Sequence, residues 1–231
     1  MSSSDASDAV DRDYALRFHR DIRLDAATAA LLLIDLQHAS ASRSSGLGAN
    51  LLSDECTDLG AWRFDRLEQL VLPNVSRLLA HARGSDLPVA HIALGSRTED
   101  LSDVPPYLRR LVASTDNRVG CPNHRHLEAV APRTGELTVT KTTASAFLST
   151  DLHGQLQARG IRQLVLTGVS TNSCVESTGR DGADLGYDCV LVEDACSAAN
   201  ASLHAGAVDN FSRLFGRTAR TTEVIAELAG P

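Results

Sequence analysis

The sequence is poor in aromatic residues. Phe, Trp and Tyr together make up 4% of the 231 residues, whereas hydrophobic residues as a whole make up 43%. A core of ordinary size must therefore be built from Leu, Val, Ile and Ala. Charged residues make up 22%, and this balance is typical of a globular protein. A chain of this length forms one large domain or at most two small ones.

Several kinds of segment are missing. The chain has no cluster of Lys or Arg and a net charge of −7, which excludes a nucleic-acid surface. It has no apolar run that could span a bilayer, so we expect no membrane partner. Residues 1–13 are rich in Ser, Asp and Ala and lack the basic and apolar regions of a signal peptide. We expect residues 1–24 to form a mobile tail, residues 25–231 to form the domain, and the protein to be cytoplasmic.

The cysteines do not form a recognisable framework. There are five, an odd number, and no CxxC pair suggests a disulfide scaffold or a zinc site. Reduced thiols are the simplest account, and Cys189 lies within a strand-like run that predicts a role in core packing. Neither GxGxxG nor a Walker A sequence is present, so no nucleotide is indicated and we expect no cofactor. The five are Cys56, Cys121, Cys174, Cys189 and Cys196.

Short apolar runs alternate with segments of helical periodicity. This alternation, with glycine at many of the turns, predicts a doubly wound, Rossmann-like α/β fold, a three-layer sandwich around a mainly parallel sheet of about six strands. The long segment 95–121, which carries Pro105-Pro106, is expected to be irregular and to face the substrate. The predicted strands are 29–36, 88–94, 137–140, 163–167, 188–193 and 217–221. The predicted helices are 64–83, 147–159, 174–185, 202–215 and one that starts at 222 or 223.

Three reactive residues fall at the carboxyl ends of predicted strands, where ligands bind in sheets of this kind. Asp35 ends the first strand, Lys141 ends the third, and Cys174 follows the turn after the fourth. Each also has an ordinary explanation. Asp35 is in a position to cap a helix, Lys141 to face solvent, and Cys174 to be a small core residue. The coincidence of all three at one edge favours a reactive site.

The three side chains together form a coherent catalytic set. A thiol needs a base in order to attack, and a departing amine needs a proton. Asp35 is placed to serve both needs, and Lys141 to hold Asp35 and to lower the pKa of the thiol. Backbone N–H groups near Ser170 and Cys174 are predicted to form an oxyanion hole. The chemistry is acyl transfer from a carboxamide, urea or carbamoyl group to cysteine, followed by hydrolysis.

Three segments carry a resemblance to a known family. These are IDLQ at residues 34–37, TKTTASAF at 140–147 and TGVSTNSCVESTGRDGADLGYDCVLVEDAC at 167–196. They resemble the isochorismatase-like cysteine hydrolases, which include nicotinamidases and N-carbamoylsarcosine, ureidoacrylate and biuret amidohydrolases. The resemblance runs from about residue 29 to residue 225. It implies a catalytic triad of Asp35, Lys141 and Cys174, a cis peptide between Val169 and Ser170, and a homodimer or homotetramer.

The sequence departs from two branches of that family. The cysteine argues against vinyl-ether hydrolysis, because isochorismatases proper lack it. The Asp-x-His motif and the further His of the nicotinamidase metal site are missing, since no histidine lies between His38 and His81. We therefore expect no metal. The resulting prediction is an amidohydrolase that forms a cysteine acyl-enzyme and cleaves a linear C–N bond of a small molecule, in a carbamoyl, ureido or carboxamide group.

The substrate contacts and two rival functions remain open from sequence alone. Arginines at 97, 109, 110 and 118 flank the long segment and suit a substrate carboxylate. The rivals are a metal-free amidase of nicotinamidase type and a non-catalytic member of the fold that binds a small molecule. The residues expected to contact the substrate are Gln37, His38, Tyr107, Arg109 and Asn172.

Overall fold

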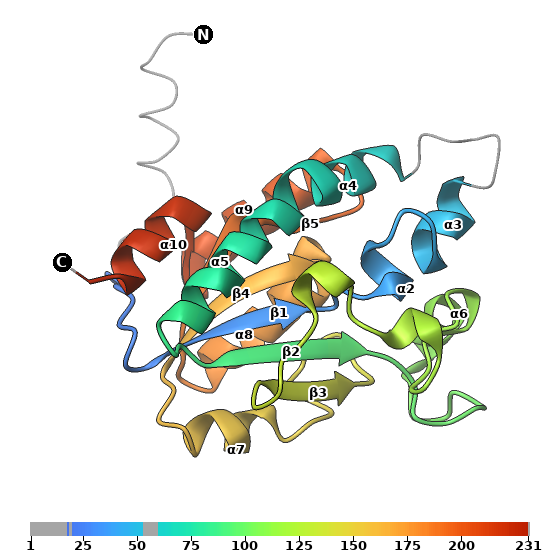
Figure 1. Cartoon of the computed structure of the whole chain (residues 1–231), viewed down its shortest axis with the longest axis horizontal. Coiled ribbons are helices and arrows are strands. Elements are labelled where there is room, and N and C mark those ends of the chain that lie inside the picture. Colours follow the sequence, from blue (N-terminus) through green and yellow to red (C-terminus); the bar gives the residue numbers. More distant parts are fainter. Residues whose placement is uncertain (1–17, 19, 53–59, 231) are drawn as a thin grey trace, which may run out of the picture.

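The computed structural model describes residue 18, residues 20–52 and residues 60–230. Within this part of the chain, six parallel strands form one sheet in the order β3-β2-β1-β4-β5-β6 (Figure 1). This is the strand order of doubly wound nucleotide-binding folds. The predicted α/β architecture is confirmed. The strands are β1 (Ala29–Ile34), β2 (Val89–Leu94), β3 (Leu137–Lys141), β4 (Gln163–Val169), β5 (Asp188–Ser197) and β6 (Arg217–Ala219).

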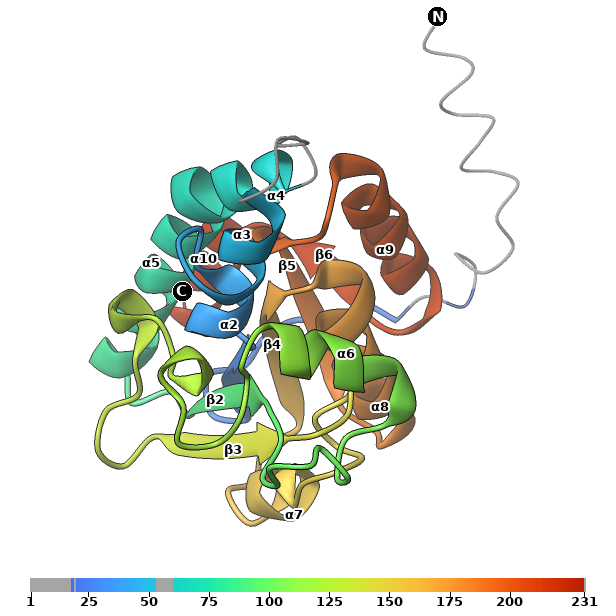
Figure 2. The ribbon, with the colours of Figure 1, turned by 90° about the vertical axis from the view of Figure 1, so that its right-hand side faces the viewer.

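Helices cover both faces of the sheet (Figure 2). The long helix α5 (Leu72–Gly84) and α10 (Thr221–Leu228) pack on one face, while α7 (Leu152–Gln157), α8 (Glu176–Asp184) and α9 (Ala201–Leu214) pack on the other. Alternate residues of a strand point to opposite faces. Leu31 and Leu33 of β1 accordingly join the first core, and Leu32 and Ile34 join the second. None of the helices in the described residues is long and apolar enough to cross a membrane.

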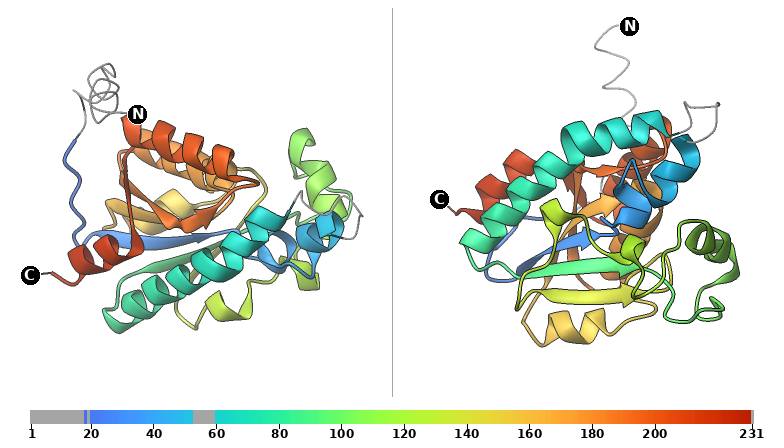
Figure 3. Two further views of the ribbon diagram at one scale, coloured as in Figure 1. Left: turned by 90° about the horizontal axis from the view of Figure 1, so that it is seen from above. Right: turned by 45° about the vertical axis from the view of Figure 1, so that its right-hand side comes forward.

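The strand order places a topological switch point between β1 and β4. The chain leaves β1 toward one side of the sheet and returns in β4 on the other, so a crevice opens beyond the carboxyl ends of these two strands. Figure 3 shows that α2 (His38–Ala41), α3 (Gly46–Leu52) and α6 (Pro106–Ser114) gather at this end of the sheet. The fold therefore leaves one edge of the sheet for a site.

Two predicted elements are different in the structure. The helix expected over 147–159 begins only at Leu152, because Ser and Thr side chains take backbone N–H groups upstream of it. Ser149 Oγ accepts from the Thr142 N–H at 3.0 Å, and Ser145 Oγ accepts from the Phe147 N–H at 3.2 Å. Such local bonds compete with a helix. Conversely, segment 95–121 is not irregular throughout, since it contains α6.

The predicted helix over 64–83 is longer and is interrupted once. It runs as α4 (Ala61–Arg66), the π-helical turn η3 (Leu67–Val71) and then α5. Pro73 has no N–H to donate and lies in the first turn of α5, where none is needed. The Leu72 N–H reaches back to the Leu67 carbonyl, which is the wider bond of a π turn.

The domain begins earlier than predicted. Ile22 and Leu24 are buried in the core, although we expected residues 1–24 to form a mobile tail. The Leu24 N–H donates to Glu227 Oε2 at 3.1 Å, and Gln163 Nε2 donates to the Arg23 carbonyl at 2.7 Å. These contacts tie the segment to α10 and β4. The rest of the predicted tail, residues 1–17 and 19, lies outside the described residues.

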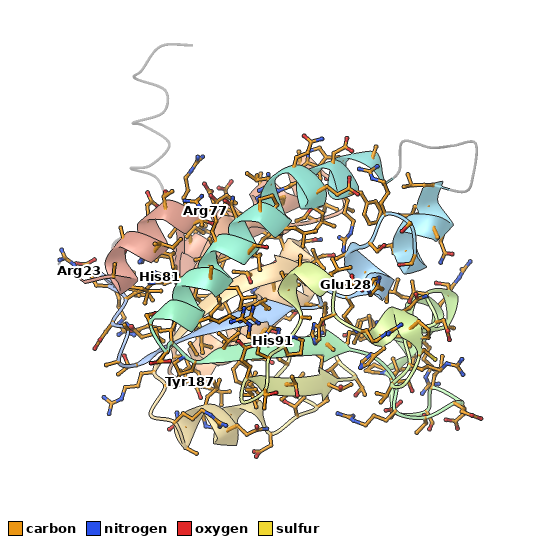
Figure 4. The ribbon with its side chains drawn as sticks, in the orientation of Figure 1. Arg23, Arg77, His81, His91, Glu128 and Tyr187 are labelled. Atoms are coloured by element: carbon orange, nitrogen blue, oxygen red, sulfur yellow. The ribbon has the colours of Figure 1, made fainter. Side chains whose placement is uncertain are left out.

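A buried polar cluster joins β2, α5 and the segment before β3. His91, labelled on β2 in Figure 4, is fully buried, and its Nε2 lies 2.8 Å from Glu136 Oε2. Arg83 from α5 donates to both oxygens of the same carboxylate, at 2.7 and 2.9 Å. The Arg83 hydrogen bond is the largest cause that lowers the pKa of Glu136, to about 2. The charged groups of this cluster, Arg83 and Glu136, are therefore paired with each other.

Gly168 is the tightest backbone contact in the sheet. Its φ is +114°, and a Cβ at this position would lie 2.0 Å from the Ile34 carbonyl oxygen of β1. Gly186 provides a matched comparison, because its φ is +91° but nothing lies within 4 Å of its Cβ position. A substitution at Gly186 therefore tests the effect of positive φ alone, whereas a substitution at Gly168 tests positive φ together with a steric clash.

We predict that Gly168→Ala destabilises the fold more than Gly186→Ala does. The Gly186 variant suffers only the unfavourable φ, about 1–3 kcal/mol. The Gly168 variant must also separate β1 from β4. Urea denaturation followed by fluorescence of the single tryptophan, Trp62, measures both. Equal losses of unfolding free energy would contradict the close contact described above.

Candidate active site

A buried ion pair joins the ends of β1 and β3. Lys141 Nζ lies 2.9 Å from Asp35 Oδ2, and the two side chains are 0% and 3% exposed. Lys141 is the last residue of β3, two strands away from β1, so its side chain must cross the end of β2. Its Nζ also donates to the Thr143 carbonyl at 3.1 Å. Lys141 is the only lysine in the chain, and every other basic position apart from histidine is arginine.

Asp35 is held in an unusual backbone conformation. Its φ is +53°, a region that few residues other than glycine adopt and that is enriched at functional sites. The Asp35 N–H donates to the Ile92 carbonyl of β2 at 2.9 Å, and Ser40 Oγ donates to the Asp35 carbonyl. The second carboxylate oxygen, Oδ1, is buried and accepts no hydrogen bond from the described residues. Asp35 thus has one oxygen paired with Lys141 and one open to a proton donor.

Cys174 lies in a π-helical turn directly after β4. The turn, η6 (Thr171–Val175), follows a cis peptide between Val169 and Ser170, as the resemblance implied. Ser170 is the N-cap, and its carbonyl accepts from the N–H groups of Ser173 and Val175 at 3.0 and 3.2 Å. The helical segment starts three residues earlier than the predicted helix at Cys174. The thiol therefore sits in its first turn, near the unpaired N–H groups of a helix start.

The surroundings of Cys174 keep the thiol protonated. Burial is the largest cause that raises its pKa, and the Asp35 charge adds to it, while Lys141 opposes both; the result is about 11. For Lys141, burial lowers the pKa, but the charges of Asp35 and Cys174 more than offset this, and its pKa is raised. The expectation that Lys141 and the helix start produce a low thiol pKa is thus wrong. The thiol is neutral beside the buried Asp35–Lys141 pair.

A small cavity of about 80 Å³ opens over these residues. Asp35 and Cys174 lie in its lining, while Lys141 lies outside it. Four leucines and two valines give it an apolar wall, and Ser40, Arg63 and Ser170 give it polar groups. The leucines and valines are Leu47, Leu94, Leu108, Leu111, Val112 and Val169. A larger hollow of about 380 Å³ lies at the amino ends of β2 and β3, at the opposite end of these strands from the switch point. Its lining contains no cysteine.

Arg63 is a cavity residue that the sequence interpretation missed. It lies on α4 and is 4% exposed. Its Nη1 donates to Ser170 Oγ at 2.8 Å and its Nη2 to the Ser40 carbonyl at 2.9 Å. A signal was present, because Arg63 precedes Leu67 and Val71 at intervals of four residues. A charged residue on a stripe of buried apolar positions indicates an interior role.

Comparison with known proteins identifies the family. The model of the isochorismatase domain matches residues 29–223, which includes Asp35, Lys141 and Cys174. The chain belongs to the isochorismatase family. The resemblance seen in the three sequence segments is thereby confirmed.

Relatives and solved structures extend over almost the whole chain. YecD, an isochorismatase family protein of Escherichia coli O157:H7, is 30% identical over 209 residues, covering 90% of this chain and all of YecD. The ureidoacrylate amidohydrolase RutB of Methylobacterium radiotolerans is 30% identical over 84% of this chain and 77% of its own length. An isochorismatase family protein from Desulfovibrio vulgaris has the same fold, with a TM-score of 0.74 and 25% identity, covering 87% of this chain and 98% of that one.

The five residues expected to contact the substrate lie outside the lining of the cavity that contains Asp35 and Cys174. Gln37 is a structural clamp: its Nε2 donates to the His124 carbonyl at 2.7 Å, and its Oε1 accepts from the Leu94 N–H at 2.9 Å. His38 pairs instead with Glu128, at 3.2 Å. Tyr107 is 68% exposed, and Asn172 is exposed on the outside of η6. None of these side chains lines the cavity, and their contact with a substrate stays a prediction.

The arginines of segment 95–121 also form contacts outside the cavity. Arg109 Nε donates to the Val104 carbonyl at 2.8 Å, Arg118 pairs with Asp116 at 2.7 Å, and Arg97 donates to the Thr140 carbonyl. None of them, nor Arg110, lies in the cavity lining. The segment nevertheless faces the cavity, as expected, through the apolar side of α6. It contributes a wall and no charge.

We predict that Asp35→Asn makes Cys174 easier to alkylate although it removes the base. Loss of the nearby negative charge lowers the thiol pKa, so more thiolate is present at a given pH. Iodoacetamide labelling of Cys174 at pH 8, followed by peptide mass spectrometry, should be faster in the variant. In the wild type the rate should rise about tenfold per pH unit below a pKa of about 11.

Two references make this labelling interpretable. Cys121 in the same sample reports the general reactivity of a partly exposed thiol. Asp65→Asn is the matched control, because Asp65 is exposed and pairs with Arg43 outside the cavity. Slower or unchanged labelling of Cys174 in Asp35→Asn would show that Asp35 does not act on the thiol.

Proposed function

We propose that this protein is a cysteine-dependent amidohydrolase that cleaves a linear C–N bond of a small molecule. Cys174 is the nucleophile, Asp35 the proton carrier and Lys141 the cation that pairs with the Asp35 carboxylate. The observation that carries the proposal is the Asp35–Lys141 pair, buried at 2.9 Å at the switch point, with Asp35 lining one small cavity together with Cys174. Burying an ion pair without a chemical purpose is of little benefit to stability.

The relatives support the same class of reaction. Several of those with 28–30% identity over 84% or more of this chain are named ureidoacrylate amidohydrolases. An N-carbamoylsarcosine amidase from Thermoplasma acidophilum shares the fold at 21% identity and a TM-score of 0.62. Amides and ureides are therefore the substrates to test first.

The first half-reaction begins with the neutral thiol. Asp35 Oδ1, which accepts no bond in the described structure, takes the S–H proton as sulfur attacks the carbonyl carbon. The carbonyl π electrons move to oxygen, and the backbone N–H groups of Ser170 and Cys174 are positioned to stabilise that charge. When the intermediate collapses, the C–N bond breaks, and Asp35 returns the proton to the departing nitrogen. The product is an S-acyl or S-carbamoyl cysteine.

The second half-reaction restores the enzyme. Asp35 removes a proton from water, whose oxygen attacks the thioester carbon, and the C–S bond breaks with the electron pair leaving on sulfur. The thiolate takes the proton from Asp35. Lys141 remains protonated throughout and stabilises the carboxylate between transfers. A protonated thiol at rest suits this cycle, because a single proton moves between Cys174, Asp35 and the leaving group.

The cavity is better suited to a small aliphatic substrate than to a pyridine amide. Its lining contains no aromatic side chain among the described residues, so nothing there stacks on a ring as in a nicotinamide site. The non-catalytic alternative predicts instead that Cys174 labels as slowly as Cys189, a fully buried thiol with a pKa of about 12. The labelling experiment above separates the two.

Cys174→Ala should abolish turnover without loss of the fold. Removal of a nucleophile that acts as part of a unit lowers kcat by about 10⁴-fold or more. Ammonia release from a panel of carboxamides, N-carbamoyl amino acids and ureido acids measures activity. Cys189→Ala is the matched control and should keep wild-type kcat. A Cys174→Ala protein that retained substantial activity would refute the proposal.

The reaction should require no metal ion. No group of three or more His, Cys, Asp or Glu side chains in the described part of the chain could hold one. His91 pairs with Glu136 in the core, and His38 pairs with Glu128 at the surface. Dialysis against EDTA should leave kcat/KM unchanged, with nicotinamide and N-carbamoyl acids assayed side by side. Loss of activity that is restored by zinc, iron or manganese would instead point to an amidase of nicotinamidase type.

A further inference from the structure

Arg63 is a buried cation without an anionic partner. It is 4% exposed, and no carboxylate of the described residues lies within ion-pair distance of it. Its two hydrogen-bond partners, Ser170 Oγ and the Ser40 carbonyl, are neutral. By contrast, Arg83, which is only partly buried, donates to both carboxylate oxygens of Glu136. Burial without such a partner is costly for a charged group.

The guanidinium also has donors to spare. It carries five N–H bonds, and the two contacts above use two of them. Its Nε is buried and has no acceptor in the described residues. Since Arg63 lines the cavity, these donors lie beside the space that a substrate would occupy. A planar fork of N–H groups matches the two oxygens of a carboxylate.

The charges of the site leave room for one anion. Asp35 and Lys141 neutralise each other at 2.9 Å, and the thiol is neutral at rest, so Arg63 contributes an unmatched positive charge. We propose that Arg63 binds the carboxylate of the substrate and thereby restricts the enzyme to short anionic ureido, carbamoyl or acylamino acids. This inference rests on the proposed function for the chemistry at Cys174.

The position of Arg63 limits the length of the substrate. Its Nη1 bonds the side chain of Ser170, whose backbone N–H is assigned to the oxyanion hole. The carboxylate must therefore lie within a few bonds of the carbonyl carbon that Cys174 attacks. The volume of about 80 Å³ imposes the same limit, and Leu108 and Val112 of α6 form a wall for the carbon atoms between the two groups. N-Carbamoylglycine fits this description better than a long-chain acid.

The test compares an acid with its neutral isostere. N-Carbamoylglycine and isobutylurea share the ureido group and the next methylene carbon. The acid then carries a carboxylate, and isobutylurea carries an isopropyl group of similar shape. Arg63→Met should lower kcat/KM about 100-fold for the acid and less than about threefold for isobutylurea, because hydrogen bonds to a charged group are lost only with the acid. Arg63→Lys keeps the charge without the fork and should give an intermediate loss for the acid.

Arg109→Met is the matched control. Arg109 belongs to α6 and bonds the Val104 carbonyl outside the cavity, so its loss should leave the preference for the acid unchanged. Thermal unfolding monitored by circular dichroism verifies that each variant is folded. Equal losses on both substrates in Arg63→Met and Arg63→Lys would overturn the inference and assign Arg63 to positioning Ser170 or balancing the thiolate.

A binding measurement separates this inference from the proposed function. In the Cys174→Ala background, calorimetry should detect N-carbamoylglycine but not isobutylurea, and the added Arg63→Met change should abolish the signal. Binding with this selectivity but no turnover by the wild type would refute the amidohydrolase and leave the anion site standing. Turnover of both substrates with no dependence on Arg63 would refute the anion site and leave the amidohydrolase standing. Absence of binding of the acid to the Cys174→Ala protein would also overturn the inference.

Discussion

The site depends on the buried ion pair between Asp35 and Lys141. Two charges that have left water must lie close together and be supported on every side, or the desolvation penalty is not offset. The parallel sheet provides that support, because it ends β1 and β3 at one edge and lets the lysine stem cross the end of β2. The Gln37 clamp on Leu94 secures this end of β2. Loss of either charge alone would leave the other buried and unpaired.

The same pair explains why the thiol is protonated at rest. Asp35 raises the pKa of Cys174 and Lys141 lowers it, so their effects oppose each other, and burial decides the outcome. One oxygen of the Asp35 carboxylate accepts no hydrogen bond from the described residues, and in the proposed mechanism this oxygen takes the thiol proton. Arg63 lines the same cavity but forms no ion pair with a carboxylate of the described residues. Its unmatched charge becomes useful only when an anion enters the cavity.

Much of the fold could be predicted from the sequence, since continuous apolar runs bounded by turns are the pattern of buried parallel strands. The errors arose where side chains override periodicity. Ser and Thr side chains before α7 accept hydrogen bonds from backbone N–H groups, so the helix begins later than its periodicity predicts. The π turn before Pro73 has no signal in the hydrophobic periodicity. The core position of Ile22 and Leu24 was missed because their hydrogen-bond partners, Arg217 and Glu227, are distant in the chain.

The sequence by itself determined the doubly wound α/β class, and it placed Asp35, Lys141 and Cys174 together at the carboxyl edge of the predicted sheet. These follow from local patterns and from the rule that parallel strands end together. Only the tertiary structure decided which side chains face the cavity. It placed Arg63 in the cavity lining, and it placed the five residues expected to contact the substrate outside that lining: Gln37, His38, Tyr107, Arg109 and Asn172. Whether a polar side chain bonds the backbone, another side chain or open space depends on contacts between distant segments, and local sequence does not encode those distances.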